Sequence, residues 1–325
     1  MIITRTPFRV SFFGGGTDFP VFFNDHGGQV LSTSIDKYCY IMARELPPFF
    51  DYKYRIRYTK REETNSIDEV SHPSVRACLR YVDLPYGVEI VHSSDIPAMS
   101  GIGSSSAFTV GLLNALYLLK GIELSKQELC QKALYIEQII LAENVGSQDQ
   151  TASSYGGLNH ISFSAGMNPD VSPIDLSSHR RDELQSSLML FFTGFSRISS
   201  DIASAQIKET PNKIPELLEM KKLVDQGIEL LNSEVPIDYF GELLHTSWCY
   251  KRTLTDRVTN QDIDDLYEQA RAAGAIGGKL CGAGAGGFLL LFVPIEKQVQ
   301  VKQALSHLLH VPFQFEEHGS HVIFR

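Results

Sequence analysis

The sequence predicts an α+β protein with two lobes, and three observations carry this prediction. The chain has 325 residues, 43% of them hydrophobic, and a chain of this length usually forms about two domains. Strand-like segments dominate the first ninety residues, whereas helical periodicity dominates most of the rest. A segment rich in Ser, Pro and Asp covers 164–178, so we expect one lobe over residues 1–178 and another over 179–325.

The first lobe is expected to begin with strands and to continue with helices. Phe8 to Phe13 is an apolar run that stops at three glycines. Asp36-Lys37 separates two segments rich in β-branched and aromatic residues, 29–35 and 38–45, which predicts a hairpin. Further strands are expected at 52–59, 87–92 and 158–163, and helices at 71–82, 105–120 and 125–144.

The second lobe is expected to be mostly helical around a few strands. The predicted helices cover 197–209, 213–232, 236–255, 261–273 and 295–308. The predicted strands cover 188–192, 276–281, 288–293, 312–316 and 321–324.

Composition excludes several classes of partner and compartment. The chain carries 29 Lys+Arg against 38 Asp+Glu, a net charge of −9, which argues against a nucleic-acid or anionic-membrane partner. No apolar run reaches the ~20 residues of a membrane span. The five cysteines are widely spaced without a C-x-x-C, which favours a reducing, cytoplasmic location over a disulfide framework. A homo-oligomer is compatible with this composition.

The segment from Pro97 to Ala107 is the first of three that could carry chemistry. It reads PAMSGIGSSSA and lies between an expected strand and an expected helix. Glycines allow close backbone approach, and the free N–H groups of a helix start attract anions such as phosphate. A serine-rich N-cap without any ligand is the plainer interpretation.

The second segment contains two acidic residues. Glu137 has mainly apolar neighbours at helical spacing, and a buried carboxylate needs a cation or a hydrogen-bond cluster. Structural pairing with an arginine and ligation of Mg²⁺ both satisfy that need. Asp149 follows in a polar stretch at 146–150, where it either caps the next helix or accepts a substrate proton.

The third segment, Lys279 to Phe288, reads KLCGAGAGGF and contains a formal G-x-G-x-x-G. The dinucleotide-binding motif requires a helix after these glycines, but a buried strand is expected at 288–293. The segment is therefore a glycine hairpin or a loop that approaches the ligand of another lobe. Lys279 is expected to be structural or exposed at the rim.

The order of these segments resembles the GHMP kinases, the family of galactokinase, homoserine kinase and mevalonate kinase. The family has an N-terminal strand and loop, a P-x-x-x-G-L-G-S-S-A-A loop and a C-terminal G-A-G-x-G-G loop. Here they match Arg9–Asp18, Pro97–Ala107 and Gly282–Gly287, so the resemblance covers nearly the whole chain. It implies a lobe like domain 2 of ribosomal protein S5, with a left-handed crossover, packed on a ferredoxin-like lobe.

The resemblance also implies roles for individual residues. Asp149 would be the base that accepts the substrate hydroxyl proton, and Arg9 would lie beside it. Glu137 and Ser105 would hold Mg²⁺. The turn that wraps the phosphates of ATP would consist of Gly101, Ile102, Gly103, Ser104, Ser105 and Ser106. The sugar side would consist of Gly15, Gly16, Thr17, Asp18 and Gly284.

One departure from the galactokinase pattern narrows the expected substrate. Galactokinases carry Glu-His where this chain has Gly15-Gly16, and the loss of two bulky side chains should leave room for a larger or phosphorylated sugar. The G-G-G-T-D form is similar to D-glycero-D-manno-heptose 7-phosphate kinases and, more loosely, to fucokinases. Ser196 and Arg197 lie in a stretch similar to the heptose kinases. They would hold a sugar phosphate, unless Arg197 is merely a surface residue.

The resemblance thus implies a cytoplasmic enzyme that uses ATP and Mg²⁺ to phosphorylate the anomeric C1 hydroxyl of D-glycero-D-manno-heptose 7-phosphate. Such a step belongs to nucleotide-sugar biosynthesis. The alternatives are a kinase for free fucose or galactose and a catalytically silent sugar sensor. Intact Arg9, Glu137 and Asp149 argue against the sensor, and the sugar-kinase form of the first segment argues against a decarboxylase of the family.

Overall fold

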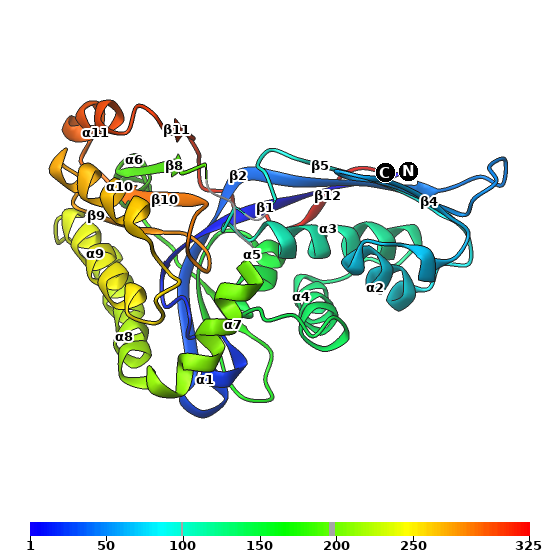
Figure 1. Ribbon diagram of the computed structural model, residues 1–325, viewed down its shortest axis with the longest axis horizontal. Helices are drawn as coiled ribbons and strands as arrows, with labels where there is room; N and C mark the ends of the chain where they lie inside the picture. The colour runs from blue at the N-terminus through cyan, green and yellow to red at the C-terminus, as the bar shows by residue number, and fades with distance from the viewer. Residues whose placement is uncertain (99, 195–198) are drawn as a thin grey trace.

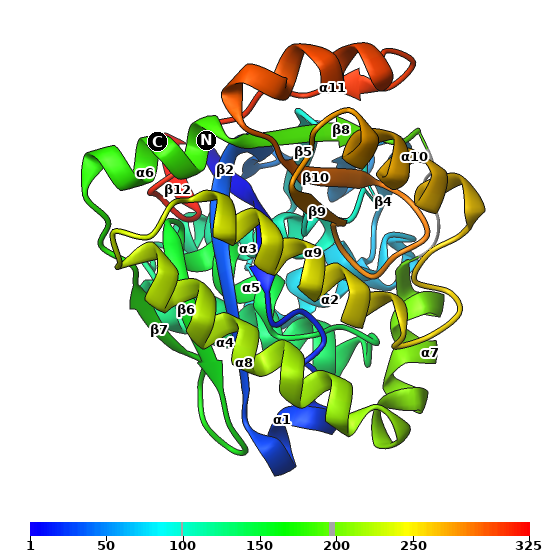
Figure 2. The same ribbon diagram turned by 90° about the vertical axis from the view of Figure 1, so that its left-hand side faces the viewer.

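The computed structural model describes residues 1–98, 100–194 and 199–325, and these form two sheets flanked by helices (Figure 1 and Figure 2). Within this part of the chain the larger sheet has eight strands and the smaller has four. Helices and sheets are thus mixed in two lobes, which confirms the predicted α+β class.

The larger sheet contains the N-terminus of the chain. Its strands follow the order β12-β1-β2-β5-β3-β4, and β6 and β7 extend it from β2. The strands are β1 (Ile2–Phe13), β2 (Gly28–Glu45), β3 (Tyr54–Arg57), β4 (Arg61–Thr64), β5 (Val88–Ser94), β6 (Leu158–Phe163), β7 (Asp170–Pro173) and β12 (His321–Phe324). β3 pairs with β5 in parallel, and the other pairs described here are antiparallel.

The smaller sheet is antiparallel and follows the order β11-β8-β10-β9. Its strands are β8 (Leu188–Phe192), β9 (Gly277–Leu280), β10 (Phe288–Phe292) and β11 (Leu309–His310). The last strand of the chain, β12, returns to the larger sheet and pairs with β1. The division at residue 178 stays a prediction.

The helices of the first half lie mostly along one face of the larger sheet (Figure 1). They are α2 (Pro73–Val82), α3 (Ser104–Leu119), α4 (Lys126–Leu134) and α5 (Gln148–Tyr155), while α1 (Pro20–His26) follows β1. α3 is apolar nearly all round, and its central residues are buried between the sheet and the other helices. Just before its first turn, the Ile102 carbonyl accepts a hydrogen bond from the backbone N–H of Arg9 on β1.

The second half adds helices around the smaller sheet and along the open end of β1 and β2. They are α6 (Ser178–Ser186), α7 (Ser199–Glu209), α8 (Ile214–Leu231), α9 (Asp238–Arg252), α10 (Gln261–Ala272) and α11 (Gln298–Ala304). The two lobes share a core, because the rings of Phe12 and Phe13 lie 5.3 and 5.0 Å from the ring of Phe240. None of the described helices combines the length and hydrophobicity that crossing a bilayer requires.

The hairpin expected at Asp36-Lys37 is wrong, because β2 is one continuous strand. β1 and β2 pair on both sides of these two residues, and the register shifts between Pro7 and Phe8 of β1. Asp36 and Lys37 are therefore the extra residues of a β-bulge, which bends a strand without reversing it. Pro7 has no N–H to donate at this point, so the interrupted ladder loses little.

The strand expected at 312–316 is also wrong. This segment makes an isolated bridge from Phe315 to Ile35. Two of its backbone N–H groups bind side chains, since Gln314 donates to Asp36 and Phe315 donates to Gln185, whereas Glu316 donates to the backbone carbonyl of Ser34. The alternation of apolar residues cannot distinguish these partners from a neighbouring strand.

Two helices end earlier than expected. The one expected at 125–144 is α4 followed by a π-helix, Tyr135–Ile140, and Ala142, at a φ of +50°, ends it. The one expected at 295–308 is a 3₁₀ turn, Ile295–Lys297, followed by the short α11. The predicted capping box at the start of α4 is confirmed.

Candidate active site

The turn at the start of α3 contains two glycines with positive φ angles. Gly103 caps the helix with a φ of +79°. Gly101 has a φ of +82°, and a side chain there would approach the Cys281 carbonyl oxygen to 2.6 Å. Because the first N–H groups of a helix lack intrahelical partners and lie at the positive end of its dipole, this turn suits a phosphate.

Arg9 and Asp149 form an ion pair directly beside this turn. Arg9 is buried on β1, and its Nε and Nη2 lie 2.8 and 2.6 Å from Oδ1 of Asp149. Its Nη1 donates to the Gly101 carbonyl at 3.0 Å, and its backbone N–H donates to the Ile102 carbonyl at 3.2 Å. Arg9 therefore fixes both the carboxylate and the turn, while Asp149 keeps a 29% exposed side chain.

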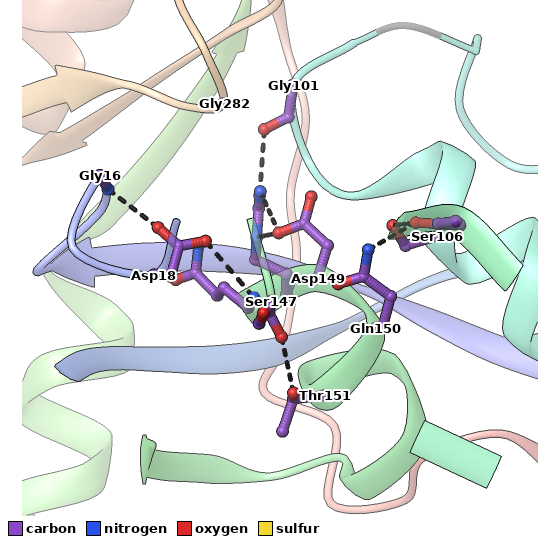
Figure 3. Close-up of polar contacts among 12 residues, drawn as sticks. Gly16, Asp18, Gly101, Ser106, Ser147, Asp149, Gln150, Thr151 and Gly282 are labelled. Atoms are coloured by element: carbon purple, nitrogen blue, oxygen red, sulfur yellow. Dashed lines mark hydrogen bonds and ion pairs between the residues drawn. The ribbon is translucent and has the colours of Figure 1, made fainter. Parts of the chain in front are cut away.

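Asp18 lies on the other side of Asp149, at the start of α5 (Figure 3). Its carboxylate accepts hydrogen bonds from the N–H groups of Gly16 at 2.9 Å and Gln148 at 3.4 Å. Burial raises the pKa of Asp18, and the nearby Asp149 charge adds to that, although the backbone N–H groups act in the opposite direction. A buried carboxyl of this kind can hold a hydroxyl of a substrate.

Glu137 is 1% exposed and lies in the π-helix Tyr135–Ile140. Its Oε2 accepts hydrogen bonds from Ser106 Oγ at 2.8 Å and from Gln150 Nε2. Its Oε1 has no hydrogen-bond partner among the described residues. Burial raises the pKa of Glu137 to about 7. The salt bridges within the described ranges do not include Glu137, so the structure does not provide the expected arginine alternative.

These residues fit a magnesium ion bound together with phosphates. No group of three or more His, Cys, Asp or Glu side chains is gathered at one point in the described part of the chain. Mg²⁺ in kinases does not require one, because it is usually bound by one or two carboxylates plus substrate phosphates and water. The unpartnered buried Oε1 of Glu137 is the oxygen that such an ion would satisfy.

The serines of the turn differ in where their side chains lie. The Ser106 hydroxyl contacts Glu137. The preceding residue, Ser105, was expected to hold the metal but is exposed. The structure thus brings Ser106 rather than Ser105 to Glu137. Figure 3 shows Asp18, Asp149, Gln150 and Ser106 in a row beneath the Gly101 turn.

The two glycines of the first loop are not equivalent. A Cβ on Gly15 would meet Ser11 Oγ at an ordinary 3.8 Å, whereas one on Gly16 would lie 2.5 Å from Gln206 Nε2. The room expected at Gly16 is therefore wrong, because the buried Gln206 of α7 already fills it. Gly15 keeps the open side of the loop. Thr17 is buried, and its hydroxyl donates to backbone carbonyls within and beside the loop.

The C-terminal glycine loop packs directly on the phosphate turn. A Cβ on Gly282 would lie 2.4 Å from Cα of Gly101, and one on Gly287 would lie 2.2 Å from the Ser100 carbonyl oxygen. β10 follows this loop, which confirms that it is not a dinucleotide motif. Gly284 faces the backbone of Val258 instead and is not brought to Asp149.

Sequence reasoning missed several residues of this region. Gln150 could have been suspected, since it immediately follows Asp149, but only the fold shows it on Glu137. Lys279 is 2% exposed, which agrees with the structural one of the two alternatives expected for it and not with a rim position. Ser196 and Arg197, the expected sugar-phosphate contacts, lie outside the described residues.

The profile described as GHMP kinases N terminal domain matches residues 72–157, and the one described as GHMP kinases C terminal matches residues 235–310. The chain belongs to the GHMP kinase family. Membership indicates an ATP-dependent kinase, and the phosphate turn beside the Arg9–Asp149 pair is consistent with this.

Individual relatives agree with that assignment. A D-glycero-alpha-D-manno-heptose 7-phosphate kinase of Campylobacter jejuni is 28% identical over 94% of this chain and 93% of its own length. A mevalonate kinase of Pyrococcus horikoshii is 28% identical over 72% of this chain and 67% of its own length. These names describe the relatives.

Solved GHMP kinase structures share the fold. A D-glycero-D-manno-heptose 1-phosphate kinase of Bacteroides thetaiotaomicron has a TM-score of 0.81 at 24% identity and covers 100% of this chain and 99% of its own. A galactokinase of Lactococcus lactis, solved with galactose, has a TM-score of 0.75 at 18% identity and covers 98% of this chain and 94% of its own.

Proposed function

We propose that this GHMP kinase is a sugar kinase that transfers the γ-phosphoryl group of ATP to the anomeric C1 hydroxyl of D-glycero-D-manno-heptose 7-phosphate. The observation that carries the reaction class is the buried Arg9, which joins Asp149 to the phosphate turn at Gly101. The likeness to a heptose 7-phosphate kinase over nearly the full length of both chains supports the choice of sugar.

The carboxylate chemistry follows from the geometry of Asp149. In this proposal the substrate hydroxyl gives its proton to Asp149 as its oxygen attacks the γ-phosphorus. The new O–P bond forms while the bond from phosphorus to the β-phosphate oxygen breaks, so the products are the sugar phosphate and ADP. Phosphoryl transfer depends mainly on positioning and charge stabilisation, and the Arg9 guanidinium provides both.

The remaining residues of the site orient the two substrates. Asp18 would accept a hydrogen bond from a sugar hydroxyl, and Gly15 would leave room on the open side of its loop. Gly101–Ser106 would hold the phosphates through backbone N–H groups. Glu137, with Ser106 and the predicted Ser105, would hold Mg²⁺, which when bound neutralises phosphate charge.

A kinase for a free sugar is the second candidate. It is supported by a bifunctional fucokinase/GDP-fucose pyrophosphorylase of Arabidopsis thaliana that is 28% identical over 68% of this chain. This chain spans only 21% of that protein. A silent sensor is not favoured, because the Arg9–Asp149 pair and the Glu137 cluster are both assembled.

The substrate is tested by comparing kcat/KM for heptose 7-phosphate, free heptose, L-fucose and galactose under the same ATP and Mg²⁺ concentrations. We expect heptose 7-phosphate to have the highest kcat/KM. Phosphorylation of fucose or galactose alone would refute the heptose proposal and leave the kinase class intact. Absence of turnover with every sugar, despite ATP binding, would favour the sensor.

A further inference from the structure

Two lysines are buried where the second lobe meets the phosphate turn. Lys279 lies on β9 and is 2% exposed, and Lys251 lies near the end of α9 and is 5% exposed. Neither was assigned a role above. Both are close to the site, because the charges of Arg9 and Asp18 act on both lysines and that of Asp149 acts on Lys251.

Each lysine ties one element of the second lobe to the backbone of the site. Lys279 Nζ donates to the Phe12 carbonyl at 3.0 Å, three residues beyond Arg9 on β1. Lys251 Nζ donates to the Leu280 carbonyl at 3.1 Å and to the Gly282 carbonyl. The first contact joins β9 to β1, and the second holds the beginning of the glycine loop on α9.

The Lys251 contact lies directly behind the junction of the two loops. Gly282 packs so closely on Gly101 that a Cβ would come within 2.4 Å of its Cα. The Gly101 carbonyl in turn accepts from Arg9 Nη1 at 3.0 Å. A shift of the glycine loop would therefore move the phosphate turn and the guanidinium that holds Asp149.

Burying the charged ammonium groups of these lysines costs free energy, and packing alone does not explain why the chain has charged residues here. Among the described residues, the ion pairs do not include Lys251 or Lys279. Burial lowers the pKa of Lys251 to about 8 and that of Lys279 to about 7; Arg9 adds to both effects, and the two lysines repel each other. A methionine of similar length would fill the same space without desolvating a charge.

We propose that Lys251 and Lys279 are positioning residues for ATP: they fix the glycine loop and the end of β1 against the phosphate turn and keep this junction electropositive for an incoming triphosphate. The proposal rests on the kinase part of the proposed function and is independent of which sugar is the substrate. It concerns residues of this chain that touch backbone, not ATP itself.

The charged neighbours of the two lysines set the expected pH dependence. The groups that face them are Arg9, Asp18, Asp149 and Cys281, together with the other lysine. As the pH rises through about 7 to 8, the ammonium groups lose protons. The junction then loses positive charge, so the affinity for ATP should fall with rising pH.

The test measures ATP binding by calorimetry with Mg²⁺ and without any sugar, between pH 6.5 and 9. For the wild-type protein we expect the Kd for ATP to rise about tenfold over this range. For Lys251→Met and Lys279→Met we expect a Kd about tenfold higher at pH 6.5 and a flatter pH profile. Melting curves at pH 6.5 show whether each variant is folded, since the carbonyls bound by these lysines lose their donor.

Lys120→Met is the matched control, because Lys120 also donates to a backbone carbonyl, that of Val82, at the far end of α3. It should bind ATP with the wild-type pH profile. Wild-type affinity and an unchanged pH profile in both folded variants would overturn the proposal. If a variant fails to fold, a pH-independent Kd in the wild-type protein overturns it equally. Because no sugar is present, failure of the heptose assignment leaves this test unaffected.

Discussion

Asp149 and Glu137 are two carboxylates of one site that lie in contrasting environments. Asp149 is partly exposed and held by a guanidinium, whereas Glu137 is enclosed by a hydroxyl and an amide without a cation. The first arrangement keeps an acceptor oriented toward the substrate. The second leaves a buried oxygen, Oε1, without a partner. In the proposed function, this difference in environment is the reason for assigning Asp149 as the base and Glu137 as a ligand of Mg²⁺.

Removal of the Asp149 carboxylate should have the largest effect. We expect Asp149→Asn to lower kcat by about 10²–10⁴-fold, because the amide cannot accept the hydroxyl proton in the same way. ATP binding should remain close to that of the wild type, as measured by calorimetry. A variant that kept more than about a tenth of the wild-type kcat would exclude Asp149 as the base.

Substitution of Arg9 tests whether Arg9 and Asp149 act together in catalysis. Arg9→Met should lower kcat by about 10²-fold, since it removes both the contact to Asp149 and the one to the Gly101 carbonyl. Arg9→Lys is the control: its single ammonium retains the charge but cannot reproduce the fork of hydrogen bonds, so it should recover only part of the activity. Full activity in Arg9→Lys would show that Arg9 contributes only its positive charge.

Glu137 tests the other side of the comparison. Glu137→Gln should raise the Mg²⁺ concentration needed for half-maximal rate by about tenfold, and high Mg²⁺ should restore part of kcat. Glu143→Gln is a matched control in the same segment, because burial also raises the pKa of Glu143. If Glu137→Gln leaves the Mg²⁺ dependence of the rate unchanged, Glu137 has a structural role and does not hold the metal.

The two loop glycines provide the smallest and most local comparison. Gly16→Ala should destabilise the protein by about 1–3 kcal/mol, because residue 16 has a φ of +106° and its Cβ would contact Gln206. Gly15→Ala should change the melting temperature little, since its side faces open space, but should raise the KM for the sugar. Equal melting temperatures for both variants would contradict the expected difference between Gly15 and Gly16.

The sequence predicted most of the site but not how its parts meet. Glu137, Asp149 and the glycine turn could be found because each depends on local spacing. The contact of Ser106 rather than Ser105 with Glu137 depends on the rotation of α3, and Gln206 fills the space beside Gly16 from 190 residues away. Such contacts are set by tertiary packing, which periodicity does not encode.

The fold shows the same division between local and long-range information. Helices with strong periodicity, such as α2 and α10, were predicted nearly to their ends. The continuity of β2 was missed because turn-like Asp36-Lys37 is absorbed by a bulge opposite Pro7. The burial of Lys251 was missed and that of Lys279 was left open between two alternatives, because their partners are backbone carbonyls.

In the proposed function, this kinase phosphorylates the anomeric position of a heptose phosphate. The most direct measurement is ³¹P NMR of the product formed from D-glycero-D-manno-heptose 7-phosphate, ATP and Mg²⁺, with Asp149→Asn as the negative control. We expect a new anomeric phosphate resonance beside the retained 7-phosphate resonance with the wild-type protein, and no new resonance with the variant. Transfer to another hydroxyl, or no transfer to this sugar under conditions where ATP binds, would contradict the proposed function.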